Sequence, residues 1–222
     1  MVLGILFLSL ALSSAAHALL NGPLLTGFFS LGLLGAAAGW LGAGPRIFGK
    51  RPDGTVPHWA YPLHWSWYAL ATVSFYGRRW STGEDAWNTV APNLIVGRRL
   101  VAAERARLND LPLSAILDMT AEFNGVRMPD VPFLNLPVLD GTAPTHAQLD
   151  QAVAWIDEHI HDGPVYVHCM MGHGRSATAA AAWLMRHNPG LSVEAAQAQL
   201  RIGRPRIRLA PDQRRALRTW RS

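Results

Sequence analysis

The stretch Val165-Tyr-Val-His-Cys-Met-Met-Gly-His-Gly-Arg-Ser176 decides the fold of this 222-residue chain. Its first four residues form an apolar run that predicts a short buried strand. An Ala-rich segment, Arg175 to His187, follows and predicts a helix that ends before Pro189-Gly190. The only cysteine of the chain, Cys169, stands where the strand ends. A buried strand that turns directly into a helix is typical of an α/β sheet covered by helices.

The turn between this strand and this helix has the composition of an anion-binding loop. Gly172 and Gly174 lack the Cβ atoms that would prevent successive backbone N–H groups from pointing at one centre. The helix adds the positive end of its dipole, and the planar guanidinium of Arg175 can hold two phosphate oxygens at once. A Cys169 thiolate below such a phosphate can attack in line, and the Ser176 hydroxyl can donate to the sulfur. The residues expected to line the loop are Met170, Met171, Gly172, His173, Gly174 and Arg175.

The motif Val-His-Cys-x-x-Gly-x-x-Arg-Ser, residues 167–176, resembles the signature loop of the dual-specificity branch of the protein tyrosine phosphatases. The resemblance extends from about Pro92 to Trp220. It implies that family's fold, a nucleophile at Cys169 and a phosphate-binding arginine at Arg175. It implies no metal and no cofactor, and none is expected.

The family also implies an aspartate on an upstream loop that protonates the leaving oxygen. Asp140 fits this role, in Pro137-Val-Leu-Asp-Gly-Thr-Ala-Pro144, and Asp150 is the next candidate. An Asp that precedes the Cys favours the dual-specificity type, because low-molecular-weight enzymes with a similar loop carry the Cys near the amino end. Asp140 before Gly141 also fits simple turn chemistry, so both interpretations stand.

Other residues near the loop have less specific interpretations. His168 is expected to give structural support by hydrogen-bonding the loop backbone. His173 stands where phosphoinositide phosphatases of the tensin type have a basic residue, although a loop histidine facing solvent fits as well. Met170 and Met171 are uncommon in such loops, and their lack of charge disfavours multiply phosphorylated inositol rings. Three acidic residues are interpreted as solvated or turn residues, namely Asp110, Asp118 and Glu122.

The function expected from these features is hydrolysis of phosphomonoesters through a phosphocysteine intermediate, of the protein tyrosine or dual-specificity type. The alternative is a lipid phosphatase acting on phosphatidylglycerophosphate or a phosphoinositide by the same mechanism. A catalytically dead module that docks phosphoproteins is a hypothesis of another class. The expected partners are a phosphoprotein or phospholipid and a membrane, and no nucleic acid is expected.

Elsewhere after about residue 88, apolar runs alternate with amphipathic segments, which predicts a mainly parallel sheet flanked by helices. Three further strands are predicted at residues 93–97, 114–118 and 133–139. Helices are predicted at 101–108, after the capping box Thr145-His-Ala-Gln148, after Ser192, and from near Pro211. Eight of the last 22 residues are Arg, in a chain of net charge +5. They predict either a solvated basic helix surface or contact with anionic lipid.

The first 45 residues contain no Asp, Glu, Lys or Arg. Two apolar runs, Val2 to Leu20 and Pro23 to Ala43, are each long enough to cross a bilayer and predict a helical hairpin anchor at residues 1–45. The small residues at 13–16 are expected to face Gly35 and Gly39, and the same two glycines offer a surface for self-association of the anchor. A cleaved signal peptide ending near Ala16-His17-Ala18 is the competing interpretation, although no basic residue precedes the first run.

Residues 46–88 predict a linker that lies on the membrane surface, because aromatic residues crowd 59–76 and no charge interrupts them. A third span across 59–76 is the alternative. Basic residues such as Arg46, Lys50 and Arg51 follow the second run, which predicts an integral membrane protein of the inner or plasma membrane with its catalytic domain, residues 89–222, in the cytoplasm.

Overall fold

The computed structural model describes residues 2–21 and 24–220, and the chain divides into two compact units. The helical unit takes residues up to Arg51 together with Val56–Glu84. The sheet unit takes Pro52–Thr55 together with the residues from Asp85 onward. The sheet unit contains the loop around Cys169, so it is the unit that positions the candidate site.

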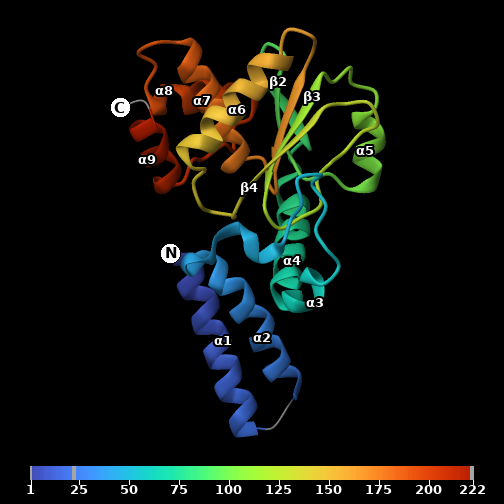
Figure 1. Cartoon of the computed structure of the whole chain (residues 1–222), viewed down its shortest axis with the longest axis vertical. Coiled ribbons are helices and arrows are strands. Elements are labelled where there is room, and N and C mark those ends of the chain that lie inside the picture. Colours follow the sequence, from blue (N-terminus) through green and yellow to red (C-terminus); the bar gives the residue numbers. More distant parts are fainter. Residues whose placement is uncertain (1, 22–23, 221–222) are drawn as a thin grey trace. The chain divides into compact units, whose positions relative to one another are not determined.

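A five-stranded sheet of order β1-β2-β5-β3-β4 forms the centre of the sheet unit (Figure 1). The strands are β1 (Trp87–Ala91), β2 (Leu94–Arg98), β3 (Ala115–Thr120), β4 (Phe133–Val138) and β5 (Val165–Cys169). Strand β1 pairs antiparallel with β2, and the other three pairings are parallel. The prediction of a mainly parallel α/β sheet is confirmed. Strand β1 was not predicted, because it is a short, half-exposed edge strand that carries Asn and Thr.

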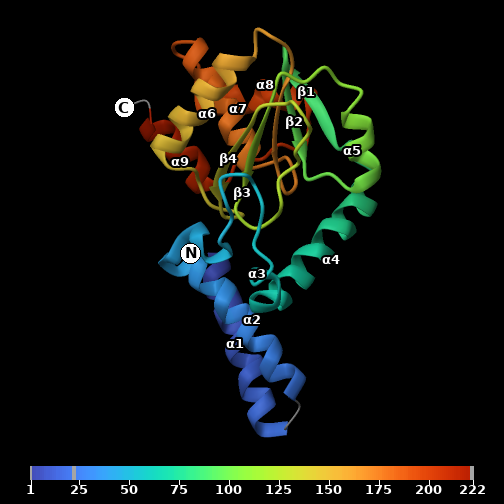
Figure 2. The same cartoon turned by 45° about the vertical axis from the view of Figure 1, so that its right-hand side comes forward.

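Helices cover both faces of this sheet (Figure 2). They are α5 (Ala102–Leu108), α6 (His146–His159), α7 (Arg175–His187), α8 (Val193–Gly203) and α9 (Pro211–Trp220). Helices α6 to α9 lie on one side, over a large core that includes Val167, Leu149 and Leu217. A smaller core around Tyr166 and Leu108 lies on the side of α5.

Local signals place the helix ends. Thr145 and Gln148 form the predicted capping box at the start of α6, and the Ser192 hydroxyl accepts from the Ala195 amide at the start of α8. Such caps satisfy N–H groups that a helix leaves without partners at its amino end. Helix α7 has the predicted bounds, Arg175–His187, and α9 begins at the predicted Pro211.

The parallel strands bring their carboxyl ends to one edge of the sheet. Strands β2, β5, β3 and β4 therefore place Arg98, Cys169, Thr120 and Val138 along the same edge. In open α/β sheets this edge is where ligands bind.

Two helices of the helical unit have the length and composition of membrane spans among the described residues. These are α1 (Val2–Asn21), with a stretch from Leu3 to Asn21, and the helical stretch Thr26–Phe48. The latter begins within α2 (Leu24–Ala38) and continues through a π-helical turn at Gly39–Ala43, kinked at Gly42, and a 3-10 turn at Gly44–Phe48. Of the predicted connecting turn, Gly22 and Pro23 lie outside the described residues.

The predicted facing of the two apolar runs is wrong. The Ser14 hydroxyl donates to the Thr26 carbonyl at 2.9 Å, so the small residues of α1 face the beginning of α2. An antiparallel hairpin with a short turn requires this pairing, because residues equally distant from the turn face each other. Gly35 instead lies against the His64 ring, and Gly39 against Ile47. Both glycines thus serve contacts within the chain, and we do not retain them as a self-association surface.

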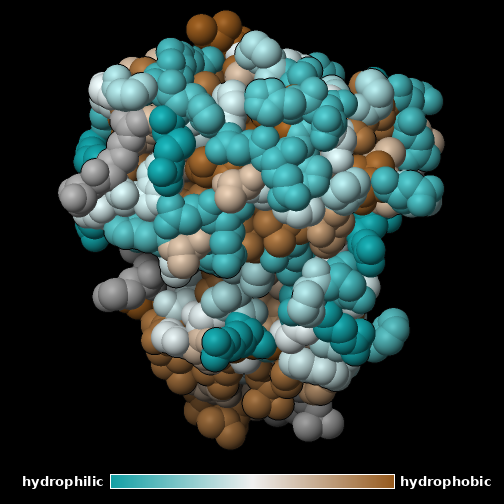
Figure 3. Space-filling model, turned by 45° about the horizontal axis from the view of Figure 1, so that its top comes forward, coloured by the Kyte–Doolittle hydropathy of each residue, from teal (hydrophilic) through white to brown (hydrophobic). Residues whose placement is uncertain are grey.

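The predicted aromatic linker is helical, in α3 (Ala60–Leu63) and α4 (Trp65–Thr82). Trp67, Ala71 and Phe75 of α4 are buried, whereas its other side exposes Leu70, Val73 and Trp80. Figure 3 shows how brown hydrophobic surface gathers over the N-terminal helices, whereas teal hydrophilic residues cover most of the sheet unit in this view. Helix α4 is not one of the two helices with the composition of a span.

The short segment Pro52–Thr55 belongs to the sheet unit although it lies between parts of the helical unit in the sequence. The Gly125 amide donates to the Gly54 carbonyl at 2.9 Å. A Cβ atom on Gly54 would lie 2.6 Å from the Phe133 ring, and Gly54 has φ +79°, so only glycine fits there without strain. The segment is therefore packed closely onto the loop after β3 and onto β4.

Candidate active site

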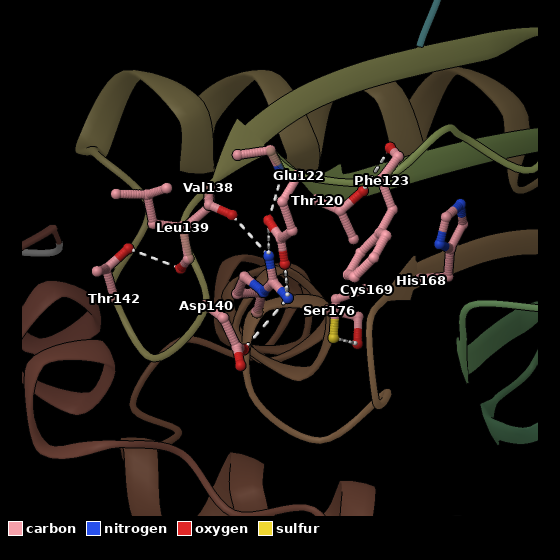
Figure 4. A network of polar contacts seen from close by, with 12 residues as sticks. Thr120, Glu122, Phe123, Val138, Leu139, Asp140, Thr142, His168, Cys169 and Ser176 are labelled. Carbon is pink, nitrogen blue, oxygen red and sulfur yellow. Dashed lines mark hydrogen bonds and ion pairs between the residues drawn. The ribbon is translucent and has the colours of Figure 1, made fainter. Parts of the chain in front are cut away.

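The sulfur of Cys169 is buried at the carboxyl end of β5 and accepts two hydrogen bonds. The backbone amide of Gly172 donates to Sγ at 3.2 Å, and the Ser176 hydroxyl donates to it at 3.3 Å (Figure 4). Two donors are thus aimed at one sulfur. The contact between Cys169 and Ser176 was predicted from the sequence, and the structure brings these two residues together.

The loop from Cys169 to Arg175, called the phosphate loop below, needs glycine at position 172. Gly172 has φ +73°, and a Cβ atom there would lie 2.6 Å from the carbonyl carbon and oxygen of Gly97 in β2. The Gly97 backbone cannot move away, because Gly97 belongs to β2 in the packed sheet. The close approach lets the loop curl tightly enough for the Gly172 amide to reach Sγ.

Arg204 holds the phosphate loop through its carbonyl oxygens. Its guanidinium is fully buried and donates to the carbonyls of Gly172 at 3.0 Å and Met171 at 3.3 Å. It also donates to the Asp85 carbonyl at 3.1 Å and to the Asn88 side chain at 2.6 Å. Fixed carbonyls fix the peptide planes of the loop, and therefore the direction of its N–H groups. The prediction of a basic surface near the carboxyl end is wrong for Arg204, because Arg204 has no exposed surface.

Arg175 lies at the amino end of α7 with only 1% of its surface exposed. It makes a two-oxygen contact with Glu122, in which Nη1 and Nη2 lie 2.9 Å and 2.8 Å from the two carboxylate oxygens. Nη1 also donates to the Val138 carbonyl at 2.7 Å, and Nη2 lies 3.2 Å from Asp140 Oδ1. Burial alone would lower the pKa of Arg175, but the charges of Glu122, Asp140 and Cys169 outweigh it and raise the pKa. The guanidinium therefore stays charged.

One donor of Arg175 has no partner among residues 2–21 and 24–220. This donor is Nε, which is buried. A buried N–H without an acceptor costs about 1–3 kcal/mol, so its presence calls for an acceptor that arrives with a ligand. A phosphate oxygen is such an acceptor, and a second oxygen of the same phosphate can meet Nη2 in the geometry that guanidinium groups prefer.

Asp140 lies in a tight turn after β4 and faces the guanidinium (Figure 4). The Thr142 amide and hydroxyl both donate to the Leu139 carbonyl, at 3.2 Å and 2.9 Å, which closes the turn around Asp140 and Gly141. The Asp140 side chain is 48% exposed, so it can reach both the buried site and solvent. It is thus both a turn residue and a neighbour of the phosphate loop.

Asp150, the second candidate for a proton donor, lies elsewhere. Its carboxylate accepts from Arg186 at 3.1 Å and from the Trp220 indole at 3.0 Å. Arg186 is near the far end of α7 from Arg175, about 16 Å along the helix axis. Asp150 therefore does not belong to the site.

Two acidic residues interpreted as solvated are buried at the site. Glu122 has no exposed surface and pairs with Arg175, and Asp118 accepts from the amide and hydroxyl of Thr120, both at 2.8 Å. The earlier interpretation is wrong for both. The available signal was their position near the carboxyl end of a buried parallel strand, since Asp118 lies in the second half of β3 and Glu122 follows its last residue closely. Side chains there lie near the sheet edge that binds ligands.

The His168 ring lies among strand residues. It stacks on Tyr166 with ring centroids 5.3 Å apart, and its Nδ1 lies 3.8 Å from Asp118 Oδ1. The predicted role of His168 in supporting the loop backbone stays a prediction. In the loop itself Met170 is buried, whereas Met171 and His173 are half-buried.

Comparison with known proteins agrees with this geometry. Residues 94–222 match the family model described as the dual specificity phosphatase catalytic domain. Human dual specificity phosphatase 28 is 32% identical over 118 residues, which cover 52% of this chain and 66% of that protein. The phosphatidylglycerophosphate phosphatase PTPMT2 of Arabidopsis thaliana is 27% identical over 140 residues, which cover 59% of this chain and 60% of that protein.

Solved structures show the same fold. The crystal structure of human DUSP28 aligns with a TM-score of 0.56 at 26% identity, covering 62% of this chain and 93% of that one. The structure described as Tk-PTP in the active form aligns with a TM-score of 0.55 at 27% identity, covering 61% and 95%. The matched family model spans more than half of the sequence, from the start of β2 onward. The chain therefore belongs to the dual specificity phosphatase family, and residues 94–222 correspond to its catalytic domain.

Proposed function

We propose that this protein hydrolyses phosphate monoesters through a covalent phosphocysteine formed on Cys169. The sulfur attacks the phosphorus in line, the bond from phosphorus to the leaving oxygen breaks, and Asp140 gives its proton to that oxygen. Arg175 holds two of the remaining phosphate oxygens and stabilises their charge during transfer. The observation that carries the proposal is the buried Arg175 Nε, which finds no acceptor among the described residues, in the same site as a sulfur that already accepts two hydrogen bonds.

The second half of the reaction returns Cys169 to its starting state. Asp140, now a carboxylate, takes a proton from a water molecule that attacks phosphorus, and the bond between phosphorus and sulfur breaks. The thiolate leaves with the bonding electrons, and the Ser176 hydroxyl stabilises it, since this hydroxyl already lies 3.3 Å from Sγ. Inorganic phosphate and a resting thiolate are the products.

As substrate we propose a phosphorylated protein side chain. The support is membership of the dual specificity family and the likeness to dual specificity phosphatase 28. The uncharged Met170 and Met171 add no positive side chain to the loop, which suits a single phosphate on an apolar carrier such as an aromatic ring.

A phospholipid with a terminal phosphate monoester is the second candidate. Two helices with the length and composition of membrane spans favour it, since they would keep the enzyme at a bilayer. The likeness to a plant phosphatidylglycerophosphate phosphatase points the same way.

We further propose that the helices α1 and α2 anchor the protein in the inner or plasma membrane with the sheet unit in the cytoplasm. The support is the absence of charged residues before Arg46 and the basic residues Arg46, Lys50 and Arg51 that follow. A reducing cytoplasm would also keep the single thiol available.

The test uses the full chain in detergent or in lipid nanodiscs. Phosphotyrosyl peptide, phosphoseryl peptide and phosphatidylglycerophosphate vesicles are compared side by side by release of inorganic phosphate. We expect turnover that vanadate blocks, with phosphotyrosyl peptide preferred. Preference for the lipid would replace our substrate proposal with the second candidate. Turnover retained in Cys169→Ser, or an absence of turnover on all three substrates, would contradict the mechanism itself.

A further inference from the structure

Gln213, on the first turn of α9, uses both ends of its side-chain amide. Only 1% of its surface is exposed. Its Oε1 accepts from the Ala210 amide at 2.9 Å, and its Nε2 donates to the Thr142 carbonyl at 2.9 Å. The first bond joins Gln213 to the residue just before α9, but the second reaches 71 residues back along the chain.

The Thr142 carbonyl is the end of the turn that carries Asp140. Leu139, at the start of this turn, follows β4 directly and accepts from the Thr142 amide and hydroxyl (Figure 4). Strand β4 therefore holds the turn at one end and Gln213 holds it at the other. Without the second contact, the outer end of the turn would lose its hydrogen bond to α9 and keep the bonds to Leu139 within the turn itself.

The same amide also lies directly on the phosphate loop. A Cβ atom on Gly174 would be 3.1 Å from Gln213 Nε2 and 3.2 Å from Oε1, which is closer than side chains normally approach. Gly174 precedes Arg175 at the start of α7 and thus ends the loop. One buried side chain therefore touches the turn of Asp140 and the phosphate loop together.

We propose that Gln213 is a positioning residue that sets the distance of the Asp140 turn from the phosphate loop. It acts through Asp140 on protonation of the leaving oxygen, and it does not touch the substrate. This inference rests on the proposed role of Asp140 as proton donor. A displacement of about 1 Å of a catalytic group can cost roughly 100-fold in rate, so a residue at this joint can govern the proton transfer without taking part in it.

The dependence of rate on the leaving group tests the proposal. A p-nitrophenolate leaves readily without a proton, whereas the phenolate of phenyl phosphate needs one. Gln213→Met keeps the length of the side chain and removes both hydrogen bonds. We expect kcat/KM for phenyl phosphate to fall roughly 10- to 100-fold, while kcat/KM for p-nitrophenyl phosphate and inhibition by inorganic phosphate stay within about threefold.

The full chain in detergent is used throughout, and circular dichroism reports folding. Gln197→Leu is the matched control, because Gln197 Oε1 accepts from the Leu209 amide at 3.0 Å and thus also supports the segment before α9. We expect Gln197→Leu to change kcat/KM by the same factor for phenyl phosphate and for p-nitrophenyl phosphate. If Gln213→Met does not fold, Gln213→Glu gives the same comparison, since it keeps the acceptor for Ala210 and loses the amide donor to Thr142.

A double-mutant cycle separates this inference from the mechanism on which it rests. If Asp140→Ala shows the selective loss on phenyl phosphate, adding Gln213→Met to it should cost nothing further. If Asp140→Ala shows no selective loss, the proposed role of Asp140 fails. If Asp140→Ala shows it but Gln213→Met slows both substrates equally or neither, Asp140 stands and our inference about Gln213 is overturned.

Discussion

Two fully buried arginines meet the phosphate loop, and their partners differ in kind. Arg204 donates to four neutral oxygens, two of them carbonyls of the loop itself. Arg175 pairs with the carboxylates of Glu122 and Asp140 and keeps a buried Nε that none of the described residues accepts from. Arg204, with its neutral partners, has a structural role in holding the loop. Arg175, with anionic partners and an N–H that the described residues leave without an acceptor, is suited to bind a ligand.

The contrast also explains how the charge of Arg175 is balanced in the site. The negative charges of Glu122, Asp140 and Cys169 all favour the charged form of Arg175, so that no uncompensated cation is buried before substrate arrives. When a phosphate dianion binds, the half-exposed Asp140 has room to move away, whereas the fully buried Glu122 is held in place. One carboxylate is therefore fixed and the other can shift.

The largest expected effect comes from Cys169→Ser. We expect turnover to fall by roughly 10⁵-fold or more, because a hydroxyl at this position is a poor nucleophile without a base. Release of inorganic phosphate from p-nitrophenyl phosphate measures it. Inorganic phosphate should still bind, because Arg175 and the loop amides remain. Loss of phosphate binding in this variant would mean that the sulfur, and not Arg175, organises the loop.

Arg175→Lys tests the arginine that faces the carboxylates. We expect kcat/KM to fall roughly 10³-fold, since an ammonium cannot hold two phosphate oxygens in one plane. Thermal unfolding should change little by comparison. The control is Arg186→Lys on the same helix, whose partner Asp150 is half-exposed. A variant that keeps near-normal kcat/KM would contradict the proposed two-oxygen contact.

Arg204→Met tests the arginine with neutral partners. It leaves carbonyls of Gly172 and Met171 buried without their donor, so we expect the free energy of unfolding to fall by about 3 kcal/mol and activity to fall with it. Thermal unfolding and turnover are measured on the same sample. Arg201→Met is the matched control on α8, because Arg201 is exposed and donates to the Pro205 carbonyl. Stability unchanged in Arg204→Met would remove the distinction drawn between the two arginines.

Glu122→Gln is expected to have the smallest effect of the four. The amide keeps one acceptor for Arg175 but loses the second, so the guanidinium is held less well and kcat should fall by about tenfold. Inorganic phosphate should bind at least as tightly, because a negative charge near it is gone. Glu104→Gln is the control, since Glu104 makes the same two-oxygen contact with Arg98. Weaker phosphate binding in Glu122→Gln would show that orientation outweighs repulsion.

The sequence predicted the parts of this fold that local patterns determine. Strand β5, the glycine loop and helix α7 follow one another within 23 residues, so hydrophobic run, turn residues and helix formers were enough to place them. The pairing of Cys169 with Ser176 was equally local. Asp140 came from the family resemblance and not from spacing, since Asp-Gly alone indicates only a turn.

The sequence could not predict contacts made between distant segments. Glu122 lies 53 residues from Arg175 and Gln213 lies 71 residues from Thr142, and nothing in either local pattern indicates a partner. Arg204 looked like one of eight basic residues near the carboxyl end, and only the fold shows that it is buried. The prediction of which residues of α1 and α2 face each other was wrong for a different reason. In an antiparallel hairpin the distance of a residue from the turn, and not its size, decides which residue it faces.

The segment Pro52–Thr55 has a practical consequence for cutting this protein into pieces. The chain passes between the two units at three junctions, after Arg51, after Thr55 and after Glu84. A protease that cleaves only after Glu84, or a gene fragment that starts at Asp85, separates the strands from the four residues whose Gly54 carbonyl accepts from Gly125. The catalytic half is therefore not one contiguous stretch of the gene. Its separation from the helical unit needs a circular permutation or a short bridge that carries these four residues along.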